Sequence, residues 1–193
     1  MIIKAYEEKH KYLLFIDLEF SGRHLVQFAG LLFRRIEDGD DIYQLARSYN
    51  VYITQKVCYP FVEYTSITNN FLNENGVPLA DAIAYIQEEF LGDDVDKDDL
   101  MIITHGLKND RLILKENGLQ LVKSNGSLVD GFCTYNAARR ILRRENHLSL
   151  EDLCNECGYY LHHAHNAYND VWAEVAIYTY LKKIEKQHET EEA

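Results

Sequence analysis

The sequence has little of several features that mark whole classes of protein. It contains only 2 prolines and 4 cysteines, and no apolar run approaches the roughly 20 residues that a membrane-spanning helix needs. Positive charge is also scarce, because 20 Lys and Arg face 31 Asp and Glu, which gives a net charge of −11. These absences exclude a disulfide scaffold and a membrane-spanning chain, and they argue against a protein held to nucleic acid or a membrane by non-specific positive charge. An enzyme whose carboxylates hold metal ions is compatible with the acidity.

Size and composition predict one globular domain. The chain has 193 residues, of which 47% are hydrophobic and 26% charged, enough apolar surface for a single core. We predict a single domain over residues 1–185 and a polar, frayed C-terminal tail over 186–193. The first ten residues lack the apolar stretch of a signal peptide, and the cysteines are expected to be reduced thiols, so a cytoplasmic protein is expected.

The hydrophobic patterns predict an α/β fold with a mixed sheet of five strands and helices on both faces. The predicted strands are residues 12–17, 25–35, 42–53, 100–104 and 127–130. The predicted helices are residues 69–75, 78–91, 109–117, 133–144, 149–157 and 167–184. A charged segment, 36–41, supplies a turn around Gly39. The strand at 12–17 is strongly apolar and is expected to be central in the sheet.

Two acids stand at the end of that central strand. Asp17 and Glu19 are two positions apart, so their side chains point to the same face of a strand. Two like charges side by side are unfavourable unless a cation lies between them. Taken alone, the pair is better explained by a strand end that emerges into water, with both acids solvated.

Further acids occupy the starts of two helices. Asp110 follows the strand at 100–104 and lies near a helix start, where the helix dipole alone favours an acid. His165 precedes the last helix, and Asp170 comes five positions later on its first turns. Each of these, taken alone, is explained as a surface or capping group. Together with the strand pair, however, they make four acids on three strongly apolar segments, the way a rigid scaffold presents a metal site. Carboxylate oxygens suit Mg²⁺ or Mn²⁺ better than zinc.

Three segments resemble, in order, the three motifs of the DEDDh-type 3′–5′ exonucleases. They are FIDLEFSG with Asp17 and Glu19, HGLKND with Asp110, and H-x₄-D with His165 and Asp170. The family includes the proofreading subunit of bacterial replicative polymerases and the oligoribonucleases. The resemblance covers about residues 12–181 and implies a ribonuclease H-like fold and a single exonuclease domain. One departure is Gly106, where many members carry Asn; we expect an intact metal site and altered substrate contacts nearby.

The resemblance also implies a mechanism. Two divalent cations, Mg²⁺ or Mn²⁺, would be held by Asp17, Glu19, Asp110 and Asp170, with Asp17 bridging them and Asp110 serving the second ion. His165 would be the general base that takes a proton from the attacking water, a role that suits an imidazole. Nucleoside 5′-monophosphates would then leave from the 3′ end of single-stranded DNA or RNA.

Four neighbouring residues are candidate substrate contacts. Lys108 and Arg111 flank Asp110 and are placed to meet phosphate if the family geometry holds. Phe20 follows Glu19 and is an aromatic ring on which a base can stack, and Ser21 lies next to it. The motifs leave open the preference between DNA, RNA and short oligonucleotides, a polymerase partner, and a homodimer, although dimers occur among similar enzymes.

A second reading of the cysteines is a zinc site. Cys154 and Cys157 form a C-x-x-C with three histidines close behind, and Cys and His are zinc ligands. On a helix, however, positions three apart share a face and pack inward, which favours buried thiols.

Two charged clusters and one rival function complete the predictions. The arginines at 139–144 are better explained as a solvated helix face than as a binding surface for phosphates. The aspartates at 93–99 are better explained as a solvated loop than as a calcium site, because they lack the glycine and the final glutamate of an EF-hand. The rival function is a non-catalytic module that binds nucleic acid or a protein. The presence of all five motif residues favours the enzyme.

Overall fold

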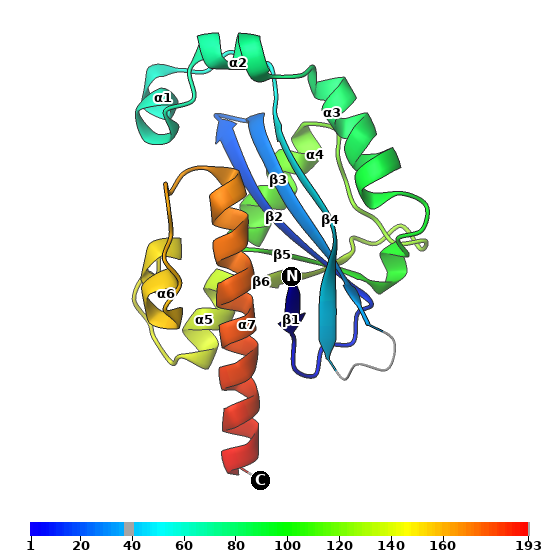
Figure 1. The fold of residues 1–193 in the computed structure, drawn as a ribbon, viewed down its shortest axis with the longest axis vertical. Coiled ribbons are helices and arrows are strands. Elements are labelled where there is room, and N and C mark those ends of the chain that lie inside the picture. Colours follow the sequence, from blue (N-terminus) through cyan, green and yellow to red (C-terminus); the bar gives the residue numbers. More distant parts are fainter. Residues whose placement is uncertain (37–40, 193) are drawn as a thin grey trace.

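A six-stranded mixed sheet separates two layers of helices (Figure 1). The computed structural model describes residues 1–36 and 41–192, and its strands follow the order β1-β4-β3-β2-β5-β6. The strands are β1 (Ile2–Lys4), β2 (Tyr12–Ser21), β3 (His24–Arg35), β4 (Ile42–Tyr52), β5 (Leu100–Thr104) and β6 (Asp130–Cys133). Strand β2 pairs antiparallel with β3 and parallel with β5, so it is central, as the sequence predicts.

Helices cover both faces of the sheet. Helix α7 crosses one face with α5 and α6 beside it, while α3 and α4 pack on the other (Figure 1). The helices are α1 (Tyr59–Thr65), α2 (Asn69–Asn75), α3 (Leu79–Tyr85), α4 (Leu107–Glu116), α5 (Thr134–Ile141), α6 (Leu150–Cys157) and α7 (Ala167–Glu192). A π-helical segment, Ile86–Leu91, continues α3. The predicted α/β fold with helices on both faces is therefore confirmed.

The alternation of side chains along β2 sets up the functional end of the sheet. Leu13 and Phe15 point into the core that α7 covers, where they meet residues such as Val171. Because successive side chains alternate between faces, Asp17 and Glu19 continue the same row toward the start of α7. A register shift between β2 and β3 follows Glu19, at the point where the strand nears its end.

Several element predictions were wrong in detail. The sheet has six strands rather than five because β1, three residues long with only Ile3 buried, pairs with β4 at the edge. Helix α1 was not predicted, and the last strand lies at Asp130–Cys133 rather than 127–130. Helix α5 ends at Ile141 instead of residue 144 because Arg143 has a positive φ of 53°. The turn predicted around Gly39 lies outside the described residues.

The C-terminal residues also differ from their prediction. Helix α7 continues to Glu192, so the expected fraying from residue 186 is wrong for the described part of the tail. Lys186 forms ion pairs with Glu7 and, at 3.7 Å, with Glu189, and these contacts hold the last turns. The division into a domain and a tail at residue 185 stays a prediction.

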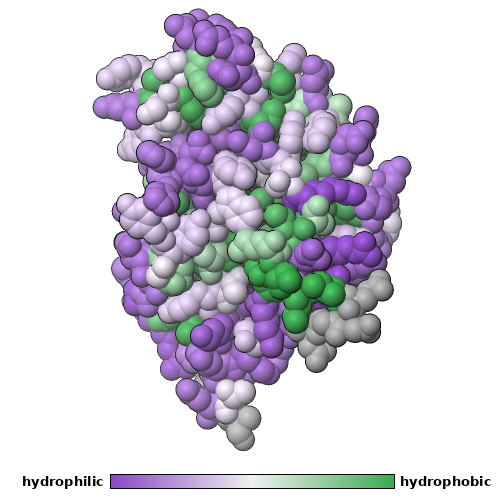
Figure 2. Space-filling model, in the orientation of Figure 1, coloured by the Kyte–Doolittle hydropathy of each residue, from purple (hydrophilic) through white to green (hydrophobic). Residues whose placement is uncertain are grey.

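The face seen in Figure 2 is mostly hydrophilic, with an apolar patch over β1, where Met1 and Ile2 are exposed. No helix in the described part of the chain combines the length and the apolar character required to cross a bilayer.

Candidate active site

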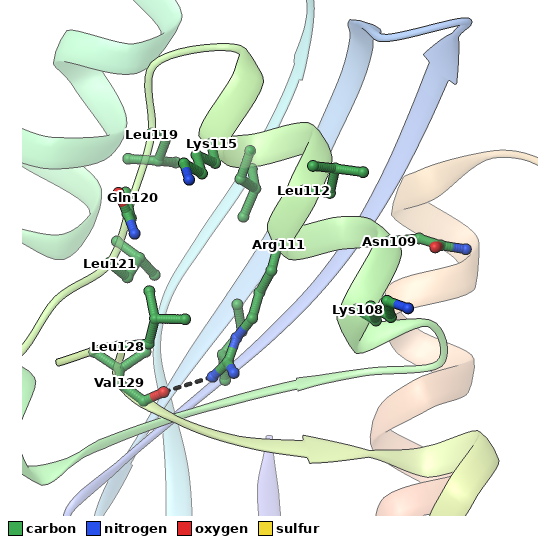
Figure 3. A pocket seen from close by; sticks show the side chains of 12 residues that line it. Lys108, Asn109, Arg111, Leu112, Lys115, Leu119, Gln120, Leu121, Leu128 and Val129 are labelled. Atoms are coloured by element: carbon green, nitrogen blue, oxygen red, sulfur yellow. Dashed lines mark hydrogen bonds between the residues drawn. The ribbon is translucent and has the colours of Figure 1, made fainter.

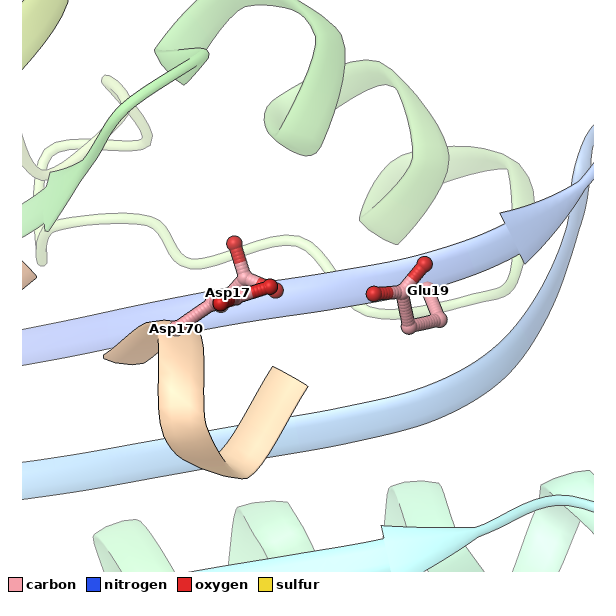
Figure 4. A group of neighbouring side chains, drawn as sticks. All are labelled: Asp17, Glu19 and Asp170. Carbon is pink, nitrogen blue, oxygen red and sulfur yellow. The ribbon is translucent and has the colours of Figure 1, made fainter. Parts of the chain in front are cut away.

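Three carboxylates converge where β2 runs past the start of α7. One oxygen each from Asp17, Glu19 and Asp170 lies within 4.8 Å of the others, and this is the one such group among the described residues (Figure 4). In the figure, Asp170 reaches from the first turn of α7 to Asp17, and Glu19 lies further along β2. All donors are hard oxygens, so the set fits Mg²⁺ or Mn²⁺.

The loop before α7 is tied to one of these carboxylates. The backbone N–H of His165 donates to Asp170 Oδ2 at 3.0 Å, and His165 itself has a left-handed φ of 64°. Asp170 is buried, yet its Oδ1 has no hydrogen-bond partner. A buried oxygen without a partner is costly unless a ligand satisfies it, and a cation would do so.

The His165 ring is exposed beside a shallow hollow. It packs edge-on against the Tyr64 ring of α1, with the ring centroids 5.4 Å apart. The hollow has a volume of about 350 Å³ and opens next to Glu19. Its other lining residues include Phe20, Ser21, Cys58, Pro60 and Phe61.

Asp110 lies close by but outside the group of three. It is buried in the first turn of α4, and its Oδ2 accepts a hydrogen bond from the Thr104 hydroxyl at the end of β5. An added Cβ at Gly106, the N-cap of α4, would lie 3.5 Å from Asp110 Oδ2, an ordinary contact. The structure therefore brings together the four predicted acids and places His165 at their edge.

Burial raises the pKa values of all four acids, and for Asp17 and Glu19 the charge of neighbouring acids adds to it. Burial, and then the charge of Asp170, raises the pKa of Glu19 from 4.5 to about 7. Burial also raises the pKa of Asp110 and of Asp170 from 3.8 to about 6. Burial and the charges of Asp170, Glu19 and Asp110 raise the pKa of Asp17 well above 3.8. The cluster holds protons near neutral pH that a divalent cation would displace.

A fifth carboxyl was missed by the sequence analysis. Glu174 lies one turn after Asp170 on α7 and has no exposed surface. Its Oε1 accepts the backbone N–H of His105 at 2.8 Å, while Oε2 has no partner. Burial, followed by the charge of Asp17, raises the pKa of Glu174 well above 4.5. The spacing of four between Asp170 and Glu174, which places both on one helix face, was the available signal.

The four candidate substrate contacts separate into two pairs. Phe20 is 36% exposed at the hollow, and Ser21 is buried there with its Oγ 3.5 Å from Cys58 Sγ. Lys108 is exposed on the first turn of α4. Arg111 lines a different hollow of about 290 Å³ under α4, where it donates to the Val129 carbonyl (Figure 3). The substrate role of all four stays a prediction.

The cysteines of the C-x-x-C lie on α6. Cys154 is buried and Cys157 half-buried, and both pack in the cluster between α6 and α7. Burial, and then Cys157, raises the pKa of Cys154 to about 12, as expected of a thiol packed among apolar side chains. Neither cysteine belongs to the metal-binding group found in the described residues.

The basic cluster and the acidic loop make structural contacts. Arg140 pairs with Glu185 at 2.7 Å, and Arg144 pairs with Glu156 at 2.8 Å. In the acidic loop, Asp94 pairs with Arg47 at 2.8 Å. These contacts agree with the structural interpretation of both segments.

A mixed sheet with helices on both faces, and with four acids and a histidine at one end, is the arrangement expected of the ribonuclease H-like class of folds. A family model described as DNA polymerase III subunit epsilon-like, C-terminal domain, of the DEDDh group, matches residues 64–181, more than half of the chain. The chain belongs to this DEDDh family, whose members are 3′–5′ exonucleases and therefore hydrolases. Membership implies dependence on divalent metal.

Solved structures share the fold. Exonuclease X in complex with 5′-overhanging duplex DNA is 17% identical, with a TM-score of 0.62 over 89% of this chain and 91% of that one. E. coli exonuclease I in complex with a dT13 oligonucleotide is 19% identical, with a TM-score of 0.69 over 92% of this chain but 42% of that one. A 3′-exonuclease described in 3′-end-specific recognition of histone mRNA stem-loop is 10% identical, with a TM-score of 0.63 over 92% of this chain and 84% of that one. No curated protein matches the sequence.

Proposed function

We propose that the protein hydrolyses single-stranded DNA or RNA from the 3′ end and releases nucleoside 5′-monophosphates. The observation that carries the proposal is the convergence of Asp17, Glu19 and Asp170 oxygens within 4.8 Å, with Asp110 and His165 beside them. These carboxylates project from the end of a strand and the first turns of two helices, which hold them rigidly, and an open hollow lies beside them.

The acids would hold two divalent cations, Mg²⁺ or Mn²⁺. Asp17, Glu19 and Asp170 would hold the first, while Asp17 and Asp110 would hold the second. When bound, such a pair lowers the pKa of the attacking water and neutralises charge on the attacking and leaving oxygens. The raised pKa values of Glu19, Asp110 and Asp170 support this assignment, because burial disfavours the charged form of each carboxylate and a bound cation would favour it.

His165 is the proposed general base. Its ring is exposed beside the carboxylates, while its backbone N–H is anchored on Asp170. A proton from the attacking water would pass to an imidazole nitrogen and then to solvent. The ring contact with Tyr64 limits the orientations open to the imidazole.

The hollow at the carboxylates suits the terminal nucleotide. Phe20, Phe61 and Tyr64 give it aromatic walls, on which bases of any sequence can stack. Stacking distinguishes weakly among bases and between DNA and RNA, so activity on both is expected. The acidic surface further implies that the strand is held by few cationic contacts, so binding without metal should be weak.

Digestion of matched 5′-labelled DNA and RNA oligonucleotides tests the proposal. In Mg²⁺ or Mn²⁺ the wild-type protein should give a ladder that shortens from the 3′ end, and EDTA should abolish it. Asp17→Ala and His165→Asn should lose at least about 100-fold in rate with unchanged circular dichroism, whereas His188→Ala, far along α7, should keep full activity. Internal cuts, or full activity in either site variant, would overturn the proposal. Tight binding of the oligonucleotide with no cleavage would favour the non-catalytic module instead.

A further inference from the structure

A chain of buried polar groups joins Asp110 to α7 behind the carboxylate cluster. Thr104 is 1% exposed at the end of β5, and its hydroxyl donates to Asp110 Oδ2. Glu174 Oε1 accepts the N–H of His105 at 2.8 Å and lies 3.5 Å from Thr104 Oγ1. Both residues therefore contact the segment that joins the end of β5 to α4, the helix whose first turn carries Asp110.

The two contacts restrain different parts of Asp110. A hydroxyl has one proton to donate, and Thr104 gives it to the nearer acceptor, Asp110, so its 3.5 Å contact with Glu174 is the weaker one. Thr104 thus fixes the orientation of the Asp110 carboxyl. Glu174 fixes the backbone at His105, and with it the position from which α4 begins.

Burying the polar side chains of Thr104 and Glu174 costs folding free energy that apolar side chains at the same positions would not cost. The rest of β5 is Leu100, Met101, Ile102 and Ile103, all buried and apolar. Glu174 lies on α7 with no exposed surface and one oxygen without a partner, an arrangement that an apolar side chain would avoid. Buried polar side chains of this kind commonly hydrogen-bond to metal ligands and orient them.

We propose that Thr104 and Glu174 are positioning residues that hold Asp110 in the orientation needed for the second cation. The proposal rests on the proposed function, because it assumes that Asp110 meets a cation. It assigns neither residue a contact with the substrate.

Thr104→Val is the first test, because it removes the hydroxyl while keeping the side-chain shape. Mn²⁺ binding to the full-length protein, followed through the electron paramagnetic resonance signal of free Mn²⁺, should show a 10–100-fold weaker second site, the range usual for loss of such partners, and a first site that is little changed. In the cleavage assay kcat should fall while KM for the oligonucleotide stays within about twofold. Thr104→Ser keeps the hydroxyl and should restore both measurements.

Glu174 is tested by a matched pair of variants. Glu174→Gln keeps an oxygen that can accept the His105 N–H and should retain near wild-type affinity at the second Mn²⁺ site. Glu174→Leu removes the acceptor and should behave like Thr104→Val. Equal affinities for the Gln and Leu variants would overturn the role assigned to Glu174.

The failure of this inference differs from failure of the proposed function. If the wild-type protein binds no Mn²⁺ and cleaves nothing, the proposed function itself fails. If it binds two ions and cleaves, but a folded Thr104→Val binds both with unchanged affinity, only the positioning role of Thr104 is overturned. If Thr104→Val loses its native circular dichroism spectrum, the comparison of Glu174→Gln with Glu174→Leu decides whether buried partners position Asp110.

Discussion

Replacing Glu19 by Gln should stabilise the metal-free protein. Glu19 has a pKa raised from 4.5 to about 7 by burial and by the charge of Asp170. Between these two values the folded state binds more protons than the unfolded state, so this group lowers stability as pH rises through that window. Above about pH 7 the full cost of the charged carboxylate is present, and the variant removes it.

The size of the effect follows from the same values. The difference between 4.5 and about 7 corresponds to roughly 3 kcal/mol, at about 1.4 kcal/mol for each pH unit. Glu19 is only half-buried, so water screens part of this, and we expect a gain of about 1–3 kcal/mol. For a chain of this length each kcal/mol shifts Tm by about 2–4 °C, which gives a rise in Tm of roughly 5 °C.

The assay is thermal unfolding in EDTA at pH 5 and pH 8, with wild type, Glu19→Gln and Glu74→Gln. Glu74 is exposed on α2, so its variant removes the same charge away from the cluster. The advantage of Glu19→Gln should be large at pH 8 and small at pH 5, and added Mn²⁺ should raise the Tm of wild type more than that of the variant. The reasoning is refuted if Glu19→Gln is less stable than wild type at pH 8, or if its advantage does not grow with pH.

Two further substitutions test packing, one in the core under α3 and one beside Asp110. Gly30→Ala should destabilise the protein by about 1–3 kcal/mol in urea unfolding, because a Cβ there would lie 2.9 Å from ring carbons of Phe28 and Phe90; an unchanged midpoint would contradict this contact. Gly106→Asn should keep or slightly raise Tm, because Asn is a favoured N-cap for α4 and its Cβ meets Asp110 at an ordinary 3.5 Å; a loss above about 1 kcal/mol would contradict it.

Local patterns were enough to predict much of this molecule. The starts of α2 and α6 lie close to their predicted positions, and there the Thr68 and Ser149 side chains each accept a backbone N–H, as N-cap residues do. The strand alternation that places Asp17 and Glu19 on one face is equally local. The occurrence of four acids on three apolar segments indicated a shared metal site, and the resemblance supplied the roles of the individual acids, because no local pattern relates β2 to α7.

Other features depend on contacts between distant segments. Strand β1 buries a single residue, Ile3, so it carries no alternation to detect. In α1 only Phe61 is buried, while Tyr59 and Tyr64 are exposed, so its apolar residues follow no helical period. The contact of Glu174 with the turn after β5 joins residues 69 positions apart. Such contacts are properties of the tertiary structure and cannot be read from spacing.

The left-handed backbone at His165 limits which residue types can replace it. Only a few residue types, chiefly Gly, Asn, Asp and His, adopt a φ of 64° at little cost. The backbone N–H of the same residue holds Asp170, so a poorly suited side chain would disturb the carboxylate as well as remove the imidazole. His165→Asn therefore isolates the loss of the proposed base, whereas a β-branched replacement would combine two defects in one measurement. The backbone conformation therefore limits which side chains can occupy position 165, whatever role the imidazole has.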